Sequence, residues 1–444
     1  MNRRDFLKHS VAAGAAASAG LFSLKARGAN DRVIVGLMGA GGRGNFLVQE
    51  FAKRPDVEIR YIADPDSRRL EGTAKAVEGI TKQRPKCVQD FRRMLEDAEV
   101  NAIINATPDH WHAPGTIFAC QAGKDVYVEK PASHSIWEGR KMIEAARTHK
   151  RVVQVGAQGR SGDYCREAIA YAHSDKFGDI HLVRVLNSKP RGAFAKKPDL
   201  PGPPEGVDYD MWLGAAPLRP FNENRFHGGW NWYWDYSGGD IINDGVHQID
   251  LARWLIGKDY PAFATAAGGK WGMPDDQDTP DTFCVNWDYD GLTMVFEQAQ
   301  WAPYLNKTPL ELRDVDEFPN WPFNGTRIEV YGTREMMYFG RHGDGWQAFG
   351  SDGKPVAGQP GKFTPMNTGH IANFIDCIRS RNLPNGDIEQ LHLSTLLCHY
   401  GNIAYRVGRR VQIDAKTEGF LDDADANALV KRSYRAPWVI PDVV

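Results

Sequence analysis

The chain has 444 residues, of which 42% are hydrophobic and 25% are charged, so it is long enough for two globular domains with cores of their own. Its formal net charge is −2 and no basic stretch interrupts it, which argues against nucleic acid as a partner. Six cysteines occur without a C-x-x-C pair, and four of them lie in apolar helical contexts, so buried free thiols are expected rather than disulfides.

The first thirty residues have the composition of an export signal. Arg3 and Arg4 form a twin-arginine pair, and an alanine-rich apolar run follows from Val11 to Leu24. This run is shorter than the ~20 residues that a membrane-spanning helix needs. We therefore predict that residues 1–30 are a twin-arginine signal peptide, that the chain is periplasmic or otherwise exported, and that no membrane span remains once the leader is removed.

A strand, a glycine-rich turn, a helix and a second strand follow, in the order of a dinucleotide-binding unit. The apolar run Val33–Met38 fits a buried parallel strand, and a second strand, Val57–Ala63, ends at Asp64. The turn between them has the pattern G-x-G-x-x-G, which lets the backbone approach a pyrophosphate closely. The cofactor-binding residues predicted in this unit are Gly39, Gly41, Gly42, Arg43, Gly44 and Asp64.

Asp64 also indicates which dinucleotide binds. A carboxylate at this position accepts hydrogen bonds from the hydroxyl groups of the adenosine ribose. The same negative charge repels a 2′-phosphate, so the sequence favours NAD over NADP. Arg68 and Arg69 follow closely and leave NADP open.

The remaining elements predict two domains. Helices and strands alternate as far as Val155, which is typical of a doubly wound parallel sheet, and we assign residues 31–152 to this α/β Rossmann domain. Residues 153–444 are predicted to form an α+β domain with a largely antiparallel sheet, open on one face for substrate or for a homodimer or homotetramer. Its predicted strands lie at 262–268, 282–289, 292–300, 326–331 and 335–339, and its helices at 240–256, 370–381 and 391–408.

Lys130 directly follows the predicted strand 126–128, in the sequence Glu129-Lys130-Pro131. Ligands of open α/β sheets bind at the carboxyl ends of the strands, so this lysine is expected to face the nicotinamide and to take a proton from a substrate hydroxyl. The alternative is a surface lysine that pairs with Glu129. Pro131 is a candidate for the cis form, which would fix the turn sharply.

A stripe of polar side chains runs along the otherwise apolar helix 240–256. At helical spacing Asp240, Asn243, Asp244, His247 and Asp250 fall on one side. One interpretation is a solvated helix face. The other is the acid–base wall of a cleft, in which a neighbouring carboxylate tunes His247.

Five large aromatic residues precede this helix, interleaved with polar groups. Flat aromatic faces beside such groups suit the C–H faces and hydroxyl groups of a sugar, while core packing is the alternative for some of them. His110 and His112 have no further ligand nearby in the sequence, so no metal site is predicted. The predicted substrate-binding residues are Gln158, Arg160, Trp230, Trp232, Tyr233, Trp234, Tyr236 and His247.

Four motifs together resemble the glucose–fructose oxidoreductase/inositol dehydrogenase (Gfo/Idh/MocA) family: the glycine turn, the run from Ala106 to His112, Glu129-Lys130-Pro131, and the Gly-Gly…His-x-x-Asp helix. The run from His370 to Ile378 is similar to the family's closing helix. The resemblance implies NAD(P)-dependent hydride transfer at a carbinol of a sugar or cyclitol. Its further cofactor contacts would be Thr107, Pro108, His110, Trp111, Glu129 and Lys130.

By the same resemblance, Lys130 corresponds to the family's catalytic lysine and His247 to its catalytic histidine. The usual aspartate, four residues before that histidine, is Asn243 here, and an asparagine cannot share a proton. Either Asp240 or Asp244 takes its place, or Lys130 and His247 act without it.

We therefore expect an exported oxidoreductase with tightly bound NAD that acts on a sugar, cyclitol or glycoside. Two alternatives stay open. One is an NAD-dependent glycosidase that works by transient oxidation and elimination, as relatives in this fold do. The other is a non-catalytic nucleotide- or sugar-binding protein.

Overall fold

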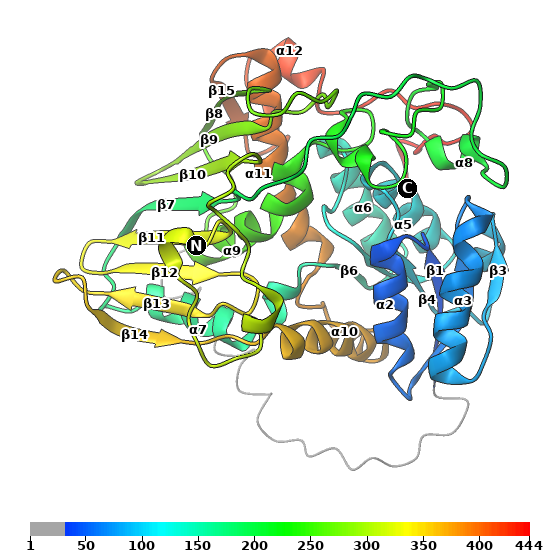
Figure 1. The fold of residues 1–444 in the computed structure, drawn as a ribbon, viewed down its shortest axis with the longest axis horizontal. Helices are drawn as coiled ribbons and strands as arrows, with labels where there is room; N and C mark the ends of the chain where they lie inside the picture. The colour runs from blue at the N-terminus through cyan, green and yellow to red at the C-terminus, as the bar shows by residue number, and fades with distance from the viewer. Residues whose placement is uncertain (1–31) are drawn as a thin grey trace.

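A computed structural model describes residues 32–444 and divides them into two sheet-based domains (Figure 1). The predicted leader, residues 1–30, lies outside the described residues. All six cysteines are free thiols, as predicted, and four of them are buried. Within residues 32–444, no helix combines the length and apolar character needed to cross a membrane.

The first domain is a six-stranded parallel sheet in the order β3-β2-β1-β4-β5-β6, as predicted for a doubly wound fold. Its central strands are almost wholly buried because helices cover both faces of the sheet. The strands are β1 (Val33–Met38), β2 (Val57–Ala63), β3 (Lys86–Val88), β4 (Ala102–Asn105), β5 (Asp125–Val128) and β6 (Val153–Val155), and the helices are α2 (Gly42–Ala52), α3 (Ser67–Thr81), α4 (Arg92–Leu95), α5 (His112–Gln121) and α6 (Ile136–Thr148).

The glycine turn has its shape for steric reasons. Gly39 has φ +94°, and a Cβ there would lie 2.7 Å from the carbonyl oxygen of Ala106. A Cβ on Gly44 would lie 1.8 Å from the carbonyl oxygen of Gly39. Any side chain at either position would therefore push α2 away from the ends of β1 and β4.

The second domain contains a ten-stranded sheet in the order β14-β13-β12-β11-β7-β10-β9-β8-β15-β16. Only the β7–β10 pair is parallel among the pairs of this sheet, and residues along β9 alternate between buried and half-buried, which is typical of a sheet covered on one face. The strands are β7 (Ile180–Leu186), β8 (Phe263–Gly269), β9 (Thr282–Tyr289), β10 (Leu292–Ala299), β11 (Arg327–Gly332), β12 (Met336–Gly340), β13 (Trp346–Phe349), β14 (Pro355–Gln359), β15 (Val411–Asp414) and β16 (Gly419–Phe420).

Helices of the second domain pack on that sheet and also reach the first domain. In Figure 1, α10 lies along the base of both domains, and its Phe374 packs against Phe51 and Tyr127 at ring-centroid distances of 6.2 and 5.7 Å. Strand β6 lies just beyond the predicted boundary at residue 152. The helices are α7 (Asp163–Ala172), α8 (Tyr209–Leu213), α9 (Val246–Ile256), α10 (Phe363–Ser380), α11 (Ile388–Val407) and α12 (Ala424–Asn427).

Buried histidines predict how stability depends on pH. Burial lowers the pKa of His110 and His399 to about 3 and that of His112 and His370 to about 4. In the unfolded chain these side chains take up protons near pH 6.5, so below that pH the unfolded state binds more protons. Protonation of each histidine in the unfolded chain then lowers the free energy of unfolding, by up to roughly 3–5 kcal/mol once the pH reaches the folded pKa.

We expect the midpoint of thermal unfolding to fall steadily between pH 6.5 and 4.5. Burial raises the pKa of Asp109 to about 7 and that of Asp64 to about 6, which opposes this trend, but two carboxylates do not offset four histidines. Scanning calorimetry at several pH values measures the trend. A midpoint that rises over this range would contradict it.

Candidate active site

Two adjoining cavities lie at the carboxyl ends of the parallel strands. One, of about 320 Å³, is bordered by the glycine turn and Asp64, and we call it the cofactor cavity. The other, of about 400 Å³, contains Lys130 and His247, and we call it the catalytic cavity. They share part of their walls, contributed by Arg43, Ala106, Thr107 and Trp230.

The cofactor cavity fits a dinucleotide at its glycine turn. Helix α2 begins after Gly41 with no side chain capping its first N–H groups, and a Cβ on Gly42 would meet nothing within 4 Å. An open space in front of uncapped N–H groups is a suitable place for a pyrophosphate. Of the predicted cofactor residues, the structure brings these to this cavity: Gly39, Gly41, Gly42, Arg43, Asp64, Thr107, Pro108 and Trp111.

Asp64 lies at the far end of the cofactor cavity and is itself held by backbone groups. The Ala40 N–H donates to its carboxylate at 2.7 Å, and the Asp66 N–H donates to it at 2.9 Å. Burial raises the pKa of Asp64 to about 6 despite these bonds. The two neighbouring arginines have different surroundings. Arg68 forms a bidentate pair with Asp66 at 2.7 Å, whereas Arg69 borders the cavity.

A segment of the second domain crosses the same end of the cofactor cavity. His227 lies 2.7 Å (Nε2) from the Asp66 carboxylate, and both His227 and Gly228 border the cavity. The two residues have φ +42° and +105°, a left-handed turn that brings Trp230 between the two cavities. We call residues 226–230 the strap.

Four predicted cofactor contacts do not border this cavity. Gly44 lies in the first turn of α2, where its missing side chain permits the close approach to Gly39. His110 is completely buried, with Nε2 2.9 Å from the carbonyl oxygen of Trp212 and its ring packed against Tyr236, so it borders neither cavity. The 3-10 turn at 109–111 places Asp109 at the catalytic cavity and Trp111 at the cofactor cavity, while the ring of His110 between them packs into the core. Glu129 and Lys130 border the catalytic cavity instead.

Lys130 extends into the catalytic cavity and is not the partner of Glu129. Glu129 pairs with Arg43 at 2.8 Å, and its side chain is only 6% exposed. The Lys130 ammonium instead donates to the backbone oxygen of Asn243 and, at 3.3 Å, to its side-chain oxygen. The Lys130–Pro131 peptide bond is cis. The interpretation of Lys130 as a surface lysine paired with Glu129 is therefore wrong.

His247 borders the catalytic cavity. Among the described residues it forms no hydrogen bond, while burial, Arg341 and Lys130 lower its pKa well below the usual value. The imidazole is therefore neutral at neutral pH and able to accept a proton.

Asp109 lies in the same wall and was not singled out in the sequence. Its carboxylate accepts a hydrogen bond from the Ser237 hydroxyl at 2.5 Å, and burial raises its pKa to about 7.

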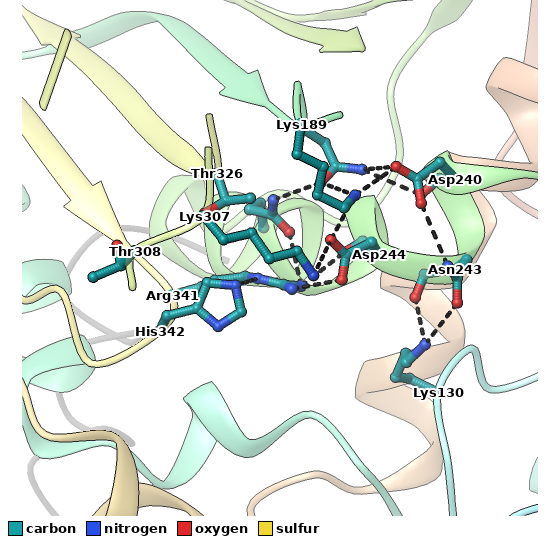
Figure 2. A network of polar contacts seen from close by, with 12 residues as sticks. Lys130, Lys189, Asp240, Asn243, Asp244, Lys307, Thr308, Thr326, Arg341 and His342 are labelled. Carbon is teal, nitrogen blue, oxygen red and sulfur yellow. Dashed lines mark hydrogen bonds and ion pairs between the residues drawn. The ribbon is translucent and has the colours of Figure 1, made fainter. Parts of the chain in front are cut away.

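The carboxylates predicted to replace the family aspartate are held in ion pairs (Figure 2). Asp244 lies 2.5 Å from Arg341, 2.7 Å from Lys189 and 3.0 Å from Lys307. Burial opposes its charge, but these cations outweigh burial and keep the pKa of Asp244 well below the usual value.

Asp240 is held in the same way. It accepts from Lys189 at 2.6 Å and from Asn187 at 2.9 Å. The first turn of the predicted helix 240–256 is a π-helix, Ile241–Gly245, and α9 follows it. Asn243, His247 and Asp250 consequently face the catalytic cavity, while Asp240 and Asp244 do not border it.

Of the predicted substrate-binding residues, Gln158, Trp230 and His247 border the catalytic cavity. Arg160 forms a buried bidentate pair with Asp250 at 2.7 to 3.1 Å and does not border the catalytic cavity, so its contact with substrate stays a prediction. Most of the aromatic run also lies elsewhere: Tyr236 is in the core, Tyr233 donates to Asp276, Trp234 packs under Arg406, and Trp232 borders a neighbouring cavity.

Several residues of the catalytic cavity carry no local sequence signal. They come from segments that the tertiary fold brings in from far along the chain, after β10, after β12 and at the start of α10. These residues are Arg313, Arg341, His342, Phe363, Met366 and Asn367. Asn231, which the sequence also did not single out, borders the same cavity and lies within the aromatic run.

Removing the charge of Asp244 tests its part in this network. We expect Asp244→Asn to lower the free energy of unfolding by about 3–5 kcal/mol, because it leaves three cations together without their shared carboxylate. Urea unfolding followed by circular dichroism measures this change. Asp352→Asn removes an exposed carboxylate and is the matched control. Unchanged stability in Asp244→Asn would show that the cations do not depend on this carboxylate.

Three family models match the chain. Residues 33–157 match the NAD-binding Rossmann fold of the Gfo/Idh/MocA oxidoreductase family, and residues 196–266 and 330–440 match its C-terminal alpha/beta domain. Residues 1–20 match the signal sequence of the twin-arginine translocation pathway.

Two curated relatives share parts of the chain. An inositol 2-dehydrogenase of Rubrobacter xylanophilus is 31% identical over 52% of this chain and 54% of its own length. An alpha-N-acetylgalactosaminidase of Shewanella oneidensis is 27% identical over 58% of this chain and 54% of its own. The chain thus spans about half the length of each of these two relatives.

A solved structure of levoglucosan dehydrogenase, in complex with NADH and levoglucosan, has the same fold. It aligns with a TM-score of 0.62 and 17% identity over 86% of this chain and 99% of its own. The family models cover the strands, the glycine turn, Lys130 and His247 that form the two cavities. The chain therefore belongs to the Gfo/Idh/MocA family of NAD-binding oxidoreductases and carries a twin-arginine export signal.

Proposed function

We propose that this protein is an exported, NAD-dependent oxidoreductase that transfers a hydride between nicotinamide and a hydroxyl-bearing carbon of a sugar, cyclitol or glycoside. The observation that carries the proposal is the joint placement of Lys130 and a neutral, uncommitted His247 in one cavity that shares a wall with the cofactor cavity. The inositol 2-dehydrogenase relative supports this reaction class.

The two residues have different parts in the proposed reaction. An ammonium has three donors, and Lys130 uses two on Asn243, which leaves one for a substrate oxygen. A ring nitrogen of His247 removes the hydroxyl proton, and Lys130 stabilises the charge that develops on the oxygen. Bound NAD supplies the hydride acceptor at nicotinamide C4. Asn243 positions Lys130 and takes no proton.

His247→Gln and Lys130→Met test these parts. We expect both variants to retain NAD and to lose hydride transfer by about 10²–10⁴-fold, the range typical of a lost acid–base group. Absorbance at 340 nm after mixing the NAD-loaded protein with a panel of sugars and cyclitols gives the rate. Lys354→Met, at a side chain 81% exposed, is the matched control. Undiminished rates in both variants would refute the assignment.

The galactosaminidase relative, together with the export signal, favours one second candidate, a glycosidase that oxidises and re-reduces its substrate around bound NAD. Aryl glycosides distinguish the two functions in the same experiment. Aglycone release without net NADH identifies the glycosidase, whereas NADH formed by a free sugar identifies the dehydrogenase. Bound NAD with neither reaction across the panel would indicate a binding protein.

We also propose that NAD is bound tightly and is preferred over NADP. The strap supports tight binding, because His227 joins the second domain to Asp66 across the adenosine end of the cofactor cavity. Asp64 and Asp66 support the preference, since a 2′-phosphate would approach two carboxylates while Arg68 is already paired.

His227→Ala tests the strap. We expect this change to speed the dissociation of NAD by about ten-fold, because a contact worth roughly 1.4 kcal/mol is lost from the closed state. Displacement of bound NADH by excess NAD, followed by fluorescence, gives the rate. His181→Ala, at an exposed position of β7, is the control. Equal dissociation rates for the two variants would show that the strap does not retain the cofactor.

A further inference from the structure

A third cavity, of about 510 Å³, opens beside the catalytic cavity. Asn243 and Arg313 border both, so the two cavities meet at these side chains. Apart from Asn243, which positions Lys130, the reaction proposed above uses no residue of this cavity. We call it the outer cavity.

The outer cavity has an excess of positive charge in its walls. Four cationic side chains border it and only one carboxylate, that of Asp240. Trp232 adds an aromatic wall beneath the guanidinium of Arg191, 4.5 Å from the ring centre. The four cations are Lys189, Arg191, Lys307 and Arg313.

Three of the four cations already have partners. Lys189 lies between Asp240 and Asp244 at 2.6 and 2.7 Å, and Lys307 lies 3.0 Å from Asp244. Arg191 pairs with Asp275 at 2.9 Å. These contacts hold the three cations in place. Because the single carboxylate of Asp244 is shared by Lys189, Lys307 and Arg341, the positive charge around the outer cavity is not fully balanced.

Arg313 is the exception. Among residues 32–444 it has no ion pair, and only its Nε is used, donating to the carbonyl oxygen of Thr308 at 2.9 Å. Its guanidinium lies 5.5 Å from the ring centre of Phe363, half-buried at the junction of the two cavities. Both terminal nitrogens therefore remain as donors for a ligand.

A second donor lies in the adjoining wall. Arg341 donates from Nε to Nε2 of His342 at 2.8 Å, so His342 accepts at Nε2 and carries its hydrogen on Nδ1. His342 is 93% buried and borders the catalytic cavity. The junction thus offers a guanidinium fork and an imidazole N–H, a donor set that matches an anion with two or more acceptor oxygens.

We propose that the outer cavity binds an acidic sugar unit, with the carboxylate of a uronate held by the fork of Arg313. The unit oxidised in the catalytic cavity and the acidic unit in the outer cavity then belong to one saccharide. Trp232 provides an apolar wall for the acidic ring, and Lys307 adds long-range attraction. This inference rests on the proposed function, since it names the class of its substrate.

Binding to NAD-loaded protein, measured by calorimetry, tests the proposal without requiring turnover. The probes are disaccharides with a glucuronate, galacturonate or mannuronate unit, each beside its carboxyl-reduced neutral counterpart and an O-sulfated form of that counterpart. We expect at least one uronate to bind about ten-fold more tightly than its neutral counterpart, as one charge-assisted bidentate contact provides. Arg313→Gln should abolish that preference, whereas Arg334→Gln, at an exposed arginine, should retain it.

Each outcome decides the matter. Equal affinity within every uronate–neutral pair overturns the proposal, and so does a preference that survives in Arg313→Gln. Tight binding of the sulfated forms alone overturns the carboxylate assignment. If the uronate preference is present but no probe reduces NAD, the proposed hydride transfer fails while the acidic subsite stands.

Discussion

A single buried carboxylate, that of Asp244, lies behind the walls of the catalytic and outer cavities and joins them. It lies in the π-helical turn before α9 and is shared by Lys189 after β7, Lys307 after β10 and Arg341 after β12. Like charges brought together in a site of low dielectric repel strongly unless a counter-charge lies between them. The carboxylate therefore permits three segments to meet there, and the site depends on their meeting.

The same arrangement determines how the neighbouring Asn243 contacts Lys130. With Asp240 and Asp244 committed to cations, the π-helical turn directs the backbone and side-chain oxygens of Asn243 at Lys130. An asparagine accepts hydrogen bonds without carrying charge, so it orients the ammonium and leaves its charge unneutralised. An aspartate in its place would pair with Lys130 and reduce the electrostatic pull of the ammonium on a substrate oxygen.

The sequence predicts the parts of the site that local geometry determines. Gly39 and Gly44 are required by close backbone contacts, and Lys130 directly follows a strand whose carboxyl end lies at the catalytic cavity. Local sequence patterns are enough to predict all three. Local patterns failed where tertiary packing decides which way a side chain points. His110 and Tyr236 pack against each other in the core, and Arg313 reaches the site from a loop without regular spacing. The strands β3, β7, β13, β14, β15 and β16 were also not predicted. Strand β7 pairs with the distant β10 and β11, whereas β13, β14 and β16 are short strands that pair with their neighbours in sequence.

The two domains together enclose the cofactor cavity, and this bears on where the protein works. The first domain supplies the glycine turn and Asp64, while the strap covers the adenosine end and Trp438 of the C-terminal segment packs against Trp111, 5.1 Å between ring centres. Such a cavity closes only when the second domain is folded. Twin-arginine export moves folded proteins, so the tight binding proposed above would let a dinucleotide enclosed in the cytoplasm leave with the chain. Outside, where free NAD is scarce, a closed cavity that retains its cofactor serves the proposed reaction better than one that exchanges it.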